Sequence, residues 1–240
     1  MNAILFVAPM RNLTKNRVIK FIRDNGGYFG IIGAISMTLS ALISFFMSSS
    51  VNPSFNIISY AVSDLVSGPM ISSIIFYVGL LISSFCQIPT YISLINYFDN
   101  RESYILLFKI TTISSFLSIF SHNILSLVPL ERKVLPLFLT HGIAAGIHFV
   151  AGSISLMLIG RLELLNIKDS KILVIISFIT GVLYSMVWIR YLLSLLVGIP
   201  EVFMNNSIQW FALAGIILWS LFHGIFLIRV KKRELGKTQL

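Results

Sequence analysis

The sequence contains few charged residues and almost no cysteine. Only 11% of its 240 residues are charged, 56% are hydrophobic, and the mean hydropathy is +0.90. Soluble domains contain about 25% charged residues, so this composition excludes a secreted enzyme, a coiled coil and a disordered tail. The single cysteine, Cys86, excludes a disulfide scaffold and a cysteine-based metal cluster. The composition is that of a membrane protein.

Several catalytic and nucleotide-binding motifs are also missing. The sequence contains no G-x-x-x-x-G-K-[ST] phosphate loop, no H-E-x-x-H pair and no polar segment long enough to form a nucleotide-binding domain. These absences argue against an ATP-driven pump and against a zincin-type protease.

The apolar residues form six continuous stretches, each long enough to cross a hydrocarbon core of about 30 Å as a helix. Their apolar character does not alternate, which excludes the strands of a membrane barrel. The predicted fold is all-α, a bundle of six transmembrane helices. The predicted spans are residues 27–48, 69–97, 104–128, 135–160, 172–198 and 207–228.

The basic residues lie mainly on one side of these spans. Of the 18 Lys and Arg residues, 14 flank one set of helix ends and only Arg132 and Lys133 flank the other. The positive-inside rule then predicts a multi-pass protein of the cell membrane with both termini in the cytoplasm. The chain is divided into a basic segment 1–26, a transmembrane domain 27–228 and a basic tail 229–240. The net charge of +9 is interpreted as topology and contact with anionic lipid, not as nucleic-acid binding. The 14 residues are Arg11, Lys15, Arg17, Lys20, Arg23, Arg101, Arg161, Lys168, Lys171, Arg229, Lys231, Lys232, Arg233 and Lys237.

The first outer connection, residues 49–68, is too apolar for a simple linker. Asn52 can cap a helix with Pro53 at its first position, and apolar residues follow at helical spacing until Gly68. The sequence predicts a short interfacial or re-entrant helix here, which carries Asp64.

Ionisable residues inside membrane helices are costly and therefore indicate function. At about 1.5 Å per residue, His122, His141 and Arg190 lie about 9–12 Å from the outer ends of their helices. We expect them to share one level and to line an outward-facing polar pocket. Asp64, Glu201 or the phosphate of a lipid headgroup would balance the charge of Arg190. The candidate pocket residues are Asp64, His122, His141, His148, Arg190 and Glu201.

A metal or haem site is an alternative use of the same residues. His148 follows His141 by seven residues, about 10.5 Å along the helix, so the two histidines are not expected to bind one ion. A zinc or haem b site would instead pair His141 with His122, with Asp64 as a further ligand or as a residue that orients one. No diagnostic ligand spacing supports such a site, and no cofactor is predicted.

The order of several motifs resembles the six-helix membrane family known as domain of unknown function 998. The resemblance extends from about residue 33 to residue 221. It rests on Asn52, Pro53, Ser59, Ser63, Asp64, Leu65, Gly68, Pro69, Phe76, Gly79, Pro129, His141, Ala145, Phe149, Gly198, Glu201 and Trp219. That family is similar in outline to the FRAG, DRAM and SFK membrane proteins, some of which are tied to lipid remodelling. The resemblance implies a role in lipid handling and supplies no catalytic residues.

Three functional hypotheses follow. The first is a pocket that binds a lipid headgroup or a small anionic solute. The second is a metal-dependent lipid hydrolase that uses His122, His141 and Asp64, with a metal-bound water as the nucleophile. The third is a small, haem-bearing subunit of a larger membrane complex. The expected partners are membrane lipids, subunits of a membrane complex or a second copy of the chain.

Overall fold

The computed structural model describes residues 17–98, 104–128, 134–167, 171–197 and 206–237. These residues form helices and no strand. Six of the helices are long and apolar enough to cross a membrane, so the predicted all-α fold with six spans is confirmed. The chain is an integral membrane protein. Its helices are α1 (Arg17–Val51), η2 (Val62–Ser67), α2 (Met70–Phe98), α3 (Ile105–Leu127), α4 (Leu135–Asn166), α5 (Lys171–Val197) and α6 (Ser207–Lys237).

By their contacts, the six long helices form a closed ring. Each helix contacts the next one in the chain, and α6 returns to contact α1. Short connections favour this order, because sequential helices then pack as antiparallel neighbours. Helices α2 and α6 also touch across the ring.

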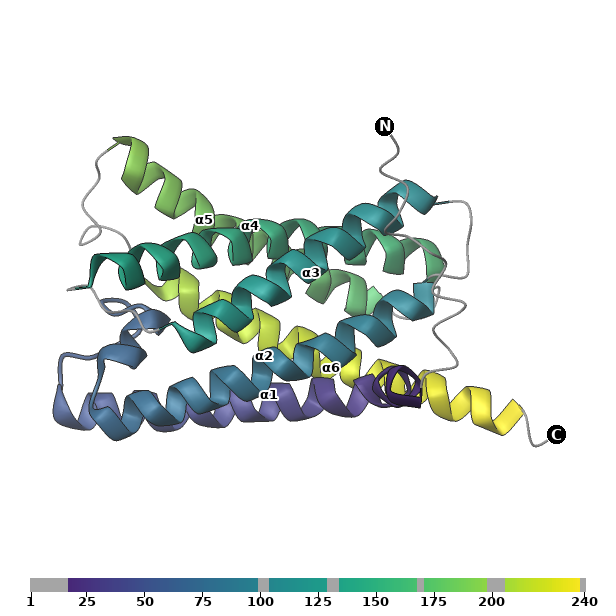
Figure 1. The fold of residues 1–240 in the computed structure, drawn as a ribbon, viewed down its shortest axis with the longest axis horizontal. Coiled ribbons are helices and arrows are strands. Elements are labelled where there is room, and N and C mark those ends of the chain that lie inside the picture. The colour runs from purple at the N-terminus through teal and green to yellow at the C-terminus, as the bar shows by residue number, and fades with distance from the viewer. Residues whose placement is uncertain (1–16, 99–103, 129–133, 168–170, 198–205, 238–240) are drawn as a thin grey trace.

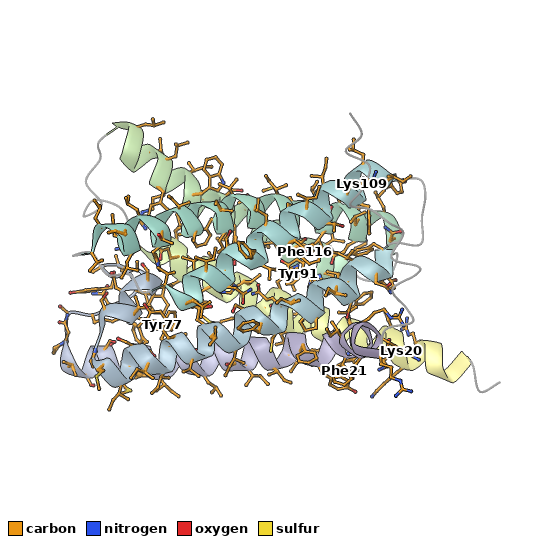
Figure 2. All side chains as sticks on the ribbon, viewed as in Figure 1. Lys20, Phe21, Tyr77, Tyr91, Lys109 and Phe116 are labelled. Carbon is orange, nitrogen blue, oxygen red and sulfur yellow. The ribbon has the colours of Figure 1, made fainter. Side chains whose placement is uncertain are left out.

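The two ends of the bundle differ in character. The first turn of α1 and the last turns of α6 lie at one end, called the basic end here, and η2 lies at the other (Figure 1). Figure 2 shows Lys20 and Lys109 toward the basic end and Tyr77 toward the η2 end. Helix α1 begins at Arg17 and α6 ends at Lys237, so the predicted boundaries at residues 26 and 228 fall inside helices.

Glycine allows α1 and α6 to touch through their backbones. A Cβ atom added at Gly27 would lie 2.7 Å from the carbonyl oxygen of Gly224, and one added at Gly224 would lie 2.7 Å from that of Gly27. Helices α1 and α2 are equally close, because a Cβ at Gly79 would overlap the side chain of Ser40. Small residues permit such approaches in membrane bundles, where the hydrophobic effect does not drive helices together.

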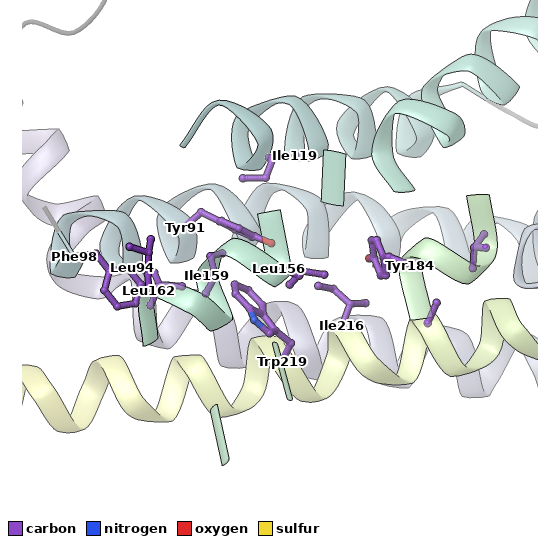
Figure 3. Packing of buried hydrophobic residues seen from close by; sticks show 12 residues of the cluster. Tyr91, Leu94, Phe98, Ile119, Leu156, Ile159, Leu162, Tyr184, Ile216 and Trp219 are labelled. Carbon is purple, nitrogen blue, oxygen red and sulfur yellow. The ribbon is translucent and has the colours of Figure 1, made fainter. Parts of the chain in front are cut away.

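The interior toward the basic end is filled by large apolar side chains. Leu156, Ile159 and Trp219 have no exposed surface, and the Trp219 ring stacks on Tyr91 with 4.9 Å between centroids. Figure 3 shows these four side chains converging between the helices. A second, smaller cluster lies under η2 and consists of Met37, Ala41, Phe55, Leu65 and Phe76. The space that neither cluster fills is the candidate site.

Candidate functional site

A cavity of about 1550 Å³ occupies the η2 end of the bundle and is lined by η2 and by all six long helices. Five of the six residues predicted to form a pocket line this cavity. They are Asp64, His122, His141, His148 and Arg190. The sixth, Glu201, lies outside the described residues.

The segment between α1 and α2 covers the cavity but is not the helix that we predicted. Residues 53–61 form turns and bends, and only Val62–Ser67 is helical, as a 3₁₀ turn. The Asn52 side chain accepts the amide of Ser54 at 3.2 Å, and the Asn56 side chain accepts the amides two and three residues later at 3.0 Å each. These local hydrogen bonds compete with helical ones, which explains why Asn52 starts a turn and not a helix.

Hydrogen bonds attach the segment 52–69, called the cap here, to the start of α6. The indole of Trp210 donates to the carbonyl oxygen of Tyr60 at 2.9 Å. The Asn206 side chain donates to the carbonyl oxygen of Ser59 at 2.8 Å, and its backbone amide donates to that of Ile58 at 3.1 Å. The cap is therefore held over the cavity by residues distant in sequence.

Asp64 stabilises the first turn of η2. Its Oδ2 atom accepts the backbone amide of Ala61 at 2.8 Å, and its own amide donates to the carbonyl oxygen of Ala61 at 3.1 Å. This reciprocal pair closes the turn at the cavity wall. Its carboxylate therefore has a structural role in the cap.

Arg190 lies seven residues before the end of α5 and its side chain is half-buried. Its Nη2 atom donates to Oδ1 of Asn206 at 2.7 Å. We predicted Asp64, Glu201 or a lipid phosphate as partners, and sequence reasoning did not single out Asn206. Asn206 connects the guanidinium to the cap, so Arg190 is held at the rim of the cavity.

His122 pairs with His148 and not with His141 as we expected. The rings of His122 and His148 have centroids 4.8 Å apart, and both side chains are buried. The Ser118 hydroxyl donates to the carbonyl oxygen of His148 at 3.2 Å, which sets the register of α3 against α4. The expectation that His148 lies two turns below His122 is wrong, because α4 has 32 residues and α3 only 23, so their ends are not level.

His141 lines the cavity nearer the beginning of α4. Its Nδ1 atom is 3.0 Å from the carbonyl oxygen of Val128, just beyond the end of α3. The ring therefore donates a hydrogen bond to a helix-terminal carbonyl oxygen, a group that has no partner within its own helix. This contact makes His141 part of the α3–α4 connection.

The arrangement does not provide a metal centre. Among the described residues, no three His, Cys, Asp or Glu side chains lie close enough together to hold an ion. The predicted set of Asp64, His122 and His141 is thus not brought together. Zinc sites need three or four such ligands.

A second polar cluster, which sequence reasoning missed, lies outside the cavity. Oε1 of Glu163 on α4 pairs with Nε2 of His223 on α6, and Oε2 accepts the hydroxyl of Ser177 on α5 at 2.9 Å. The Trp219 indole donates to the Ser177 oxygen at 3.0 Å, and His223 Nδ1 donates to the carbonyl oxygen of Trp219 at 2.7 Å. All four side chains have no exposed surface.

One sequence feature could have revealed this cluster: Glu163 interrupts an apolar run that continues along α4. The predicted fourth span ended at residue 160, which placed Glu163 just beyond that span, in a connection of the transmembrane domain. The acidic partner of His223 comes from another helix, which the position of His223 in the sequence does not specify. Every polar atom of the cluster is satisfied internally, which indicates a structural role.

No protein-family model matches this chain, and neither the curated proteins nor the solved structures contain a match. The resemblance to the domain-of-unknown-function-998 family therefore stays a prediction. By its fold and its site, the chain is an integral membrane protein whose described residues form six long helices with a large cavity at one end.

Proposed function

We propose that this membrane protein binds a lipid in the cavity at its η2 end, with the headgroup inside and the acyl chains directed into the bilayer. The cavity that carries the proposal is lined by apolar and polar side chains from all six long helices. The role in lipid handling, the cell-membrane location and the orientation with both termini in the cytoplasm belong to this proposal.

The size of the cavity favours a lipid over a small anionic solute. Sites for small molecules usually measure about 300–1,000 Å³. The cavity measures about 1550 Å³, and its wall includes the apolar residues Met37, Phe76, Leu80 and Ile217. A small anion would leave these apolar surfaces uncovered.

Arg190 supplies a positive charge at the rim. Arginine binds phosphate with two parallel hydrogen bonds, and these charge-assisted bonds are stronger in a site from which water is partly excluded. The guanidinium is positioned through Asn206 and lines the cavity wall. An anionic phosphodiester headgroup is the ligand that matches this charge.

The wall formed by α4 and α5 supports an exit for the acyl chains. Several cavity-lining residues on these helices are more than one-third exposed, among them Phe138 (41%), Val150 (37%) and Leu192 (41%). The C-terminal end of α5 leans away from the bundle (Figure 1). Acyl chains in this position would cover apolar side chains that face the bilayer.

The hydrolase and haem hypotheses gain no specific observation. The described residues do not assemble three metal ligands. Three further points remain predictions: membership in a larger complex, self-association, and the resemblance to the domain-of-unknown-function-998 family.

The experiment that tests the proposal is the measurement of bound phospholipid. We expect protein purified in mild detergent to retain phospholipid and to rebind it after delipidation, as measured by native mass spectrometry. Gly142→Trp should abolish binding, because Gly142 lines the cavity and a Cβ there meets nothing within 4 Å.

The matched control is Ile143→Trp, one residue further along α4. Ile143 is 63% exposed and is not part of the cavity wall, so this variant should bind lipid normally. Loss of lipid in both variants, or in neither, would contradict the proposed site.

A further inference from the structure

The end of the cavity nearest the core carries three polar side chains from three helices. Gln87 on α2, His122 on α3 and His148 on α4 all line the cavity, and each is more than nine-tenths buried. We call these three residues the polar base.

One nitrogen of each histidine is bound to the protein. His122 Nδ1 lies 3.2 Å from Oε1 of Gln87, and His148 Nδ1 lies 3.1 Å from the carbonyl oxygen of Ser118. Because side-chain amide and peptide carbonyl oxygens can only accept hydrogen bonds, each Nδ1 carries the proton of a neutral imidazole. Each Nε2 atom is then an acceptor with a lone pair.

The remaining polar atoms of the base have no partner among the described residues. The hydrogen bonds of these side chains leave His122 Nε2, His148 Nε2 and the Gln87 amide nitrogen unused. Every fully enclosed side-chain nitrogen or oxygen in the described part of the chain does have a partner. The three unused atoms are therefore not fully enclosed, and they face the cavity that their side chains line.

Two imidazole acceptors and one amide NH2 group, which carries two donors, select a particular ligand chemistry in such a place. A hydroxyl group both donates and accepts, so a pair of hydroxyls can satisfy imidazole nitrogens and an amide together. An apolar group would leave buried polar atoms unpaired, which is costly. A phosphate has no proton-donating atom when it is an ionised diester.

We propose that the polar base binds hydroxyl groups, so that the ligand is an anionic lipid whose headgroup carries a polyol such as glycerol, inositol or a sugar. This inference rests on the proposed function. It adds a specificity that Arg190 cannot provide, because Arg190 would accept any phosphodiester.

The spacing of the two polar regions agrees with one headgroup that spans them. Tyr184 on α5 packs against His148 with 5.3 Å between ring centroids. Arg190 follows six residues later, about 9 Å along the helix toward the η2 end. The long Arg190 side chain covers part of this distance, which places a phosphate near the rim and the hydroxyls at the base.

The experiment compares two lipids with the same charge. Phosphatidylglycerol and phosphatidylethanol are both singly charged phosphodiesters, but only the first has headgroup hydroxyls. We expect the full chain, delipidated in detergent, to bind phosphatidylglycerol about tenfold more tightly, which corresponds to one or two hydrogen bonds. Dissociation constants from native mass spectrometry measure this ratio.

Variants of the base should remove the preference and retain the binding. His148→Phe keeps the ring against Tyr184, and Gln87→Met keeps the side-chain length, but both remove polar atoms that face the cavity. We expect the affinity ratio to fall to about one in each, because phosphatidylglycerol loses hydrogen bonds that phosphatidylethanol cannot make. Ser115→Ala is the control, because Ser115 bonds to Ser155 between α3 and α4 at 2.6 Å and does not line the cavity.

The outcomes separate the inference from the proposed function. Equal affinities for the two lipids in the wild type, or an unchanged ratio in both base variants, would overturn the polyol preference and leave lipid binding intact. No binding of either lipid would instead overturn the proposed function. Displacement of phosphatidylglycerol by an equal concentration of free glycerol 3-phosphate would identify a soluble polyol phosphate as the ligand and would overturn a lipid source.

Discussion

Glu163 on α4 and His223 on α6 are hydrogen bonded inside the bundle, and neither side chain has any exposed surface. Ser177 donates its hydroxyl to Glu163, so the pair connects three helices that are consecutive in the chain. The His223 ring also stacks on Trp219 with 4.3 Å between centroids. This cluster is a fully buried polar link between α4, α5 and α6.

We predict that either single replacement in this pair is strongly destabilising. Glu163→Leu or His223→Leu leaves one buried polar partner alone, which typically costs about 3–5 kcal/mol. The double replacement removes both groups, so its cost should be clearly less than the sum of the two single costs. Unfolding of the three variants in detergent measures this coupling. Additive costs would show that the two side chains act independently.

The crossing of α1 and α6 should not tolerate a larger side chain. Gly27→Leu places a branched side chain where even a Cβ would lie 2.7 Å from the Gly224 carbonyl oxygen, so the helices must separate. We expect a loss of about 1–3 kcal/mol in unfolding free energy, the usual cost of overpacking. Gly142→Ala is the control, since a Cβ there has no neighbour within 4 Å. Equal stability of both variants would mean that the crossing is not tight.

The orientation in the membrane can be tested with cysteine labelling. We predict that a cysteine replacing Ile57, which is 43% exposed in the cap, reacts with an impermeant reagent added outside intact cells. A cysteine replacing Lys232 near the end of α6 should be protected until the cells are opened. The native Cys86 is buried and should give little background. The reverse pattern would place the cavity on the cytoplasmic side.

Arg190 should determine the affinity for charged headgroups. Arg190→Ala removes the guanidinium, and we expect the affinity for phosphatidylethanol to fall about tenfold, as for the loss of one charge-assisted hydrogen bond. Lys109→Ala removes an exposed charge that does not line the cavity, and binding should be unchanged. Similar losses in both variants would show that the membrane-facing charge of the whole protein, and not this site, attracts the lipid.

The histidines show how far a depth estimate from sequence can be trusted. Counting residues from helix ends assumes that neighbouring ends are level, and it paired His122 with His141. The contact between Ser118 and His148 shows instead that α4 extends beyond α3, so that His148 is the neighbour of His122. Interhelical register depends on how side chains fit across the interface, which residue spacing within one helix does not specify.

The cap shows a related limit. Apolar spacing after Asn52 predicted a continuous helix, but the hydrogen bonds of the Asn52 and Asn56 side chains to nearby amides produce turns. By contrast, η2 ends at Ser67 and α2 begins at Met70, so the break falls at Gly68 and Pro69 as predicted. Short-range signals were therefore reliable where glycine and proline act directly on the backbone.

The sequence by itself determined the number of spans, their approximate positions and their helical character. These features follow from a local requirement, because each segment in hydrocarbon must be long, apolar and internally hydrogen bonded. Only the tertiary structure decided which polar side chains meet: His122 with His148, Arg190 with Asn206, and Glu163 with His223. The physical reason is that each pair joins different helices, and their contact depends on the register and order of packing of the whole ring.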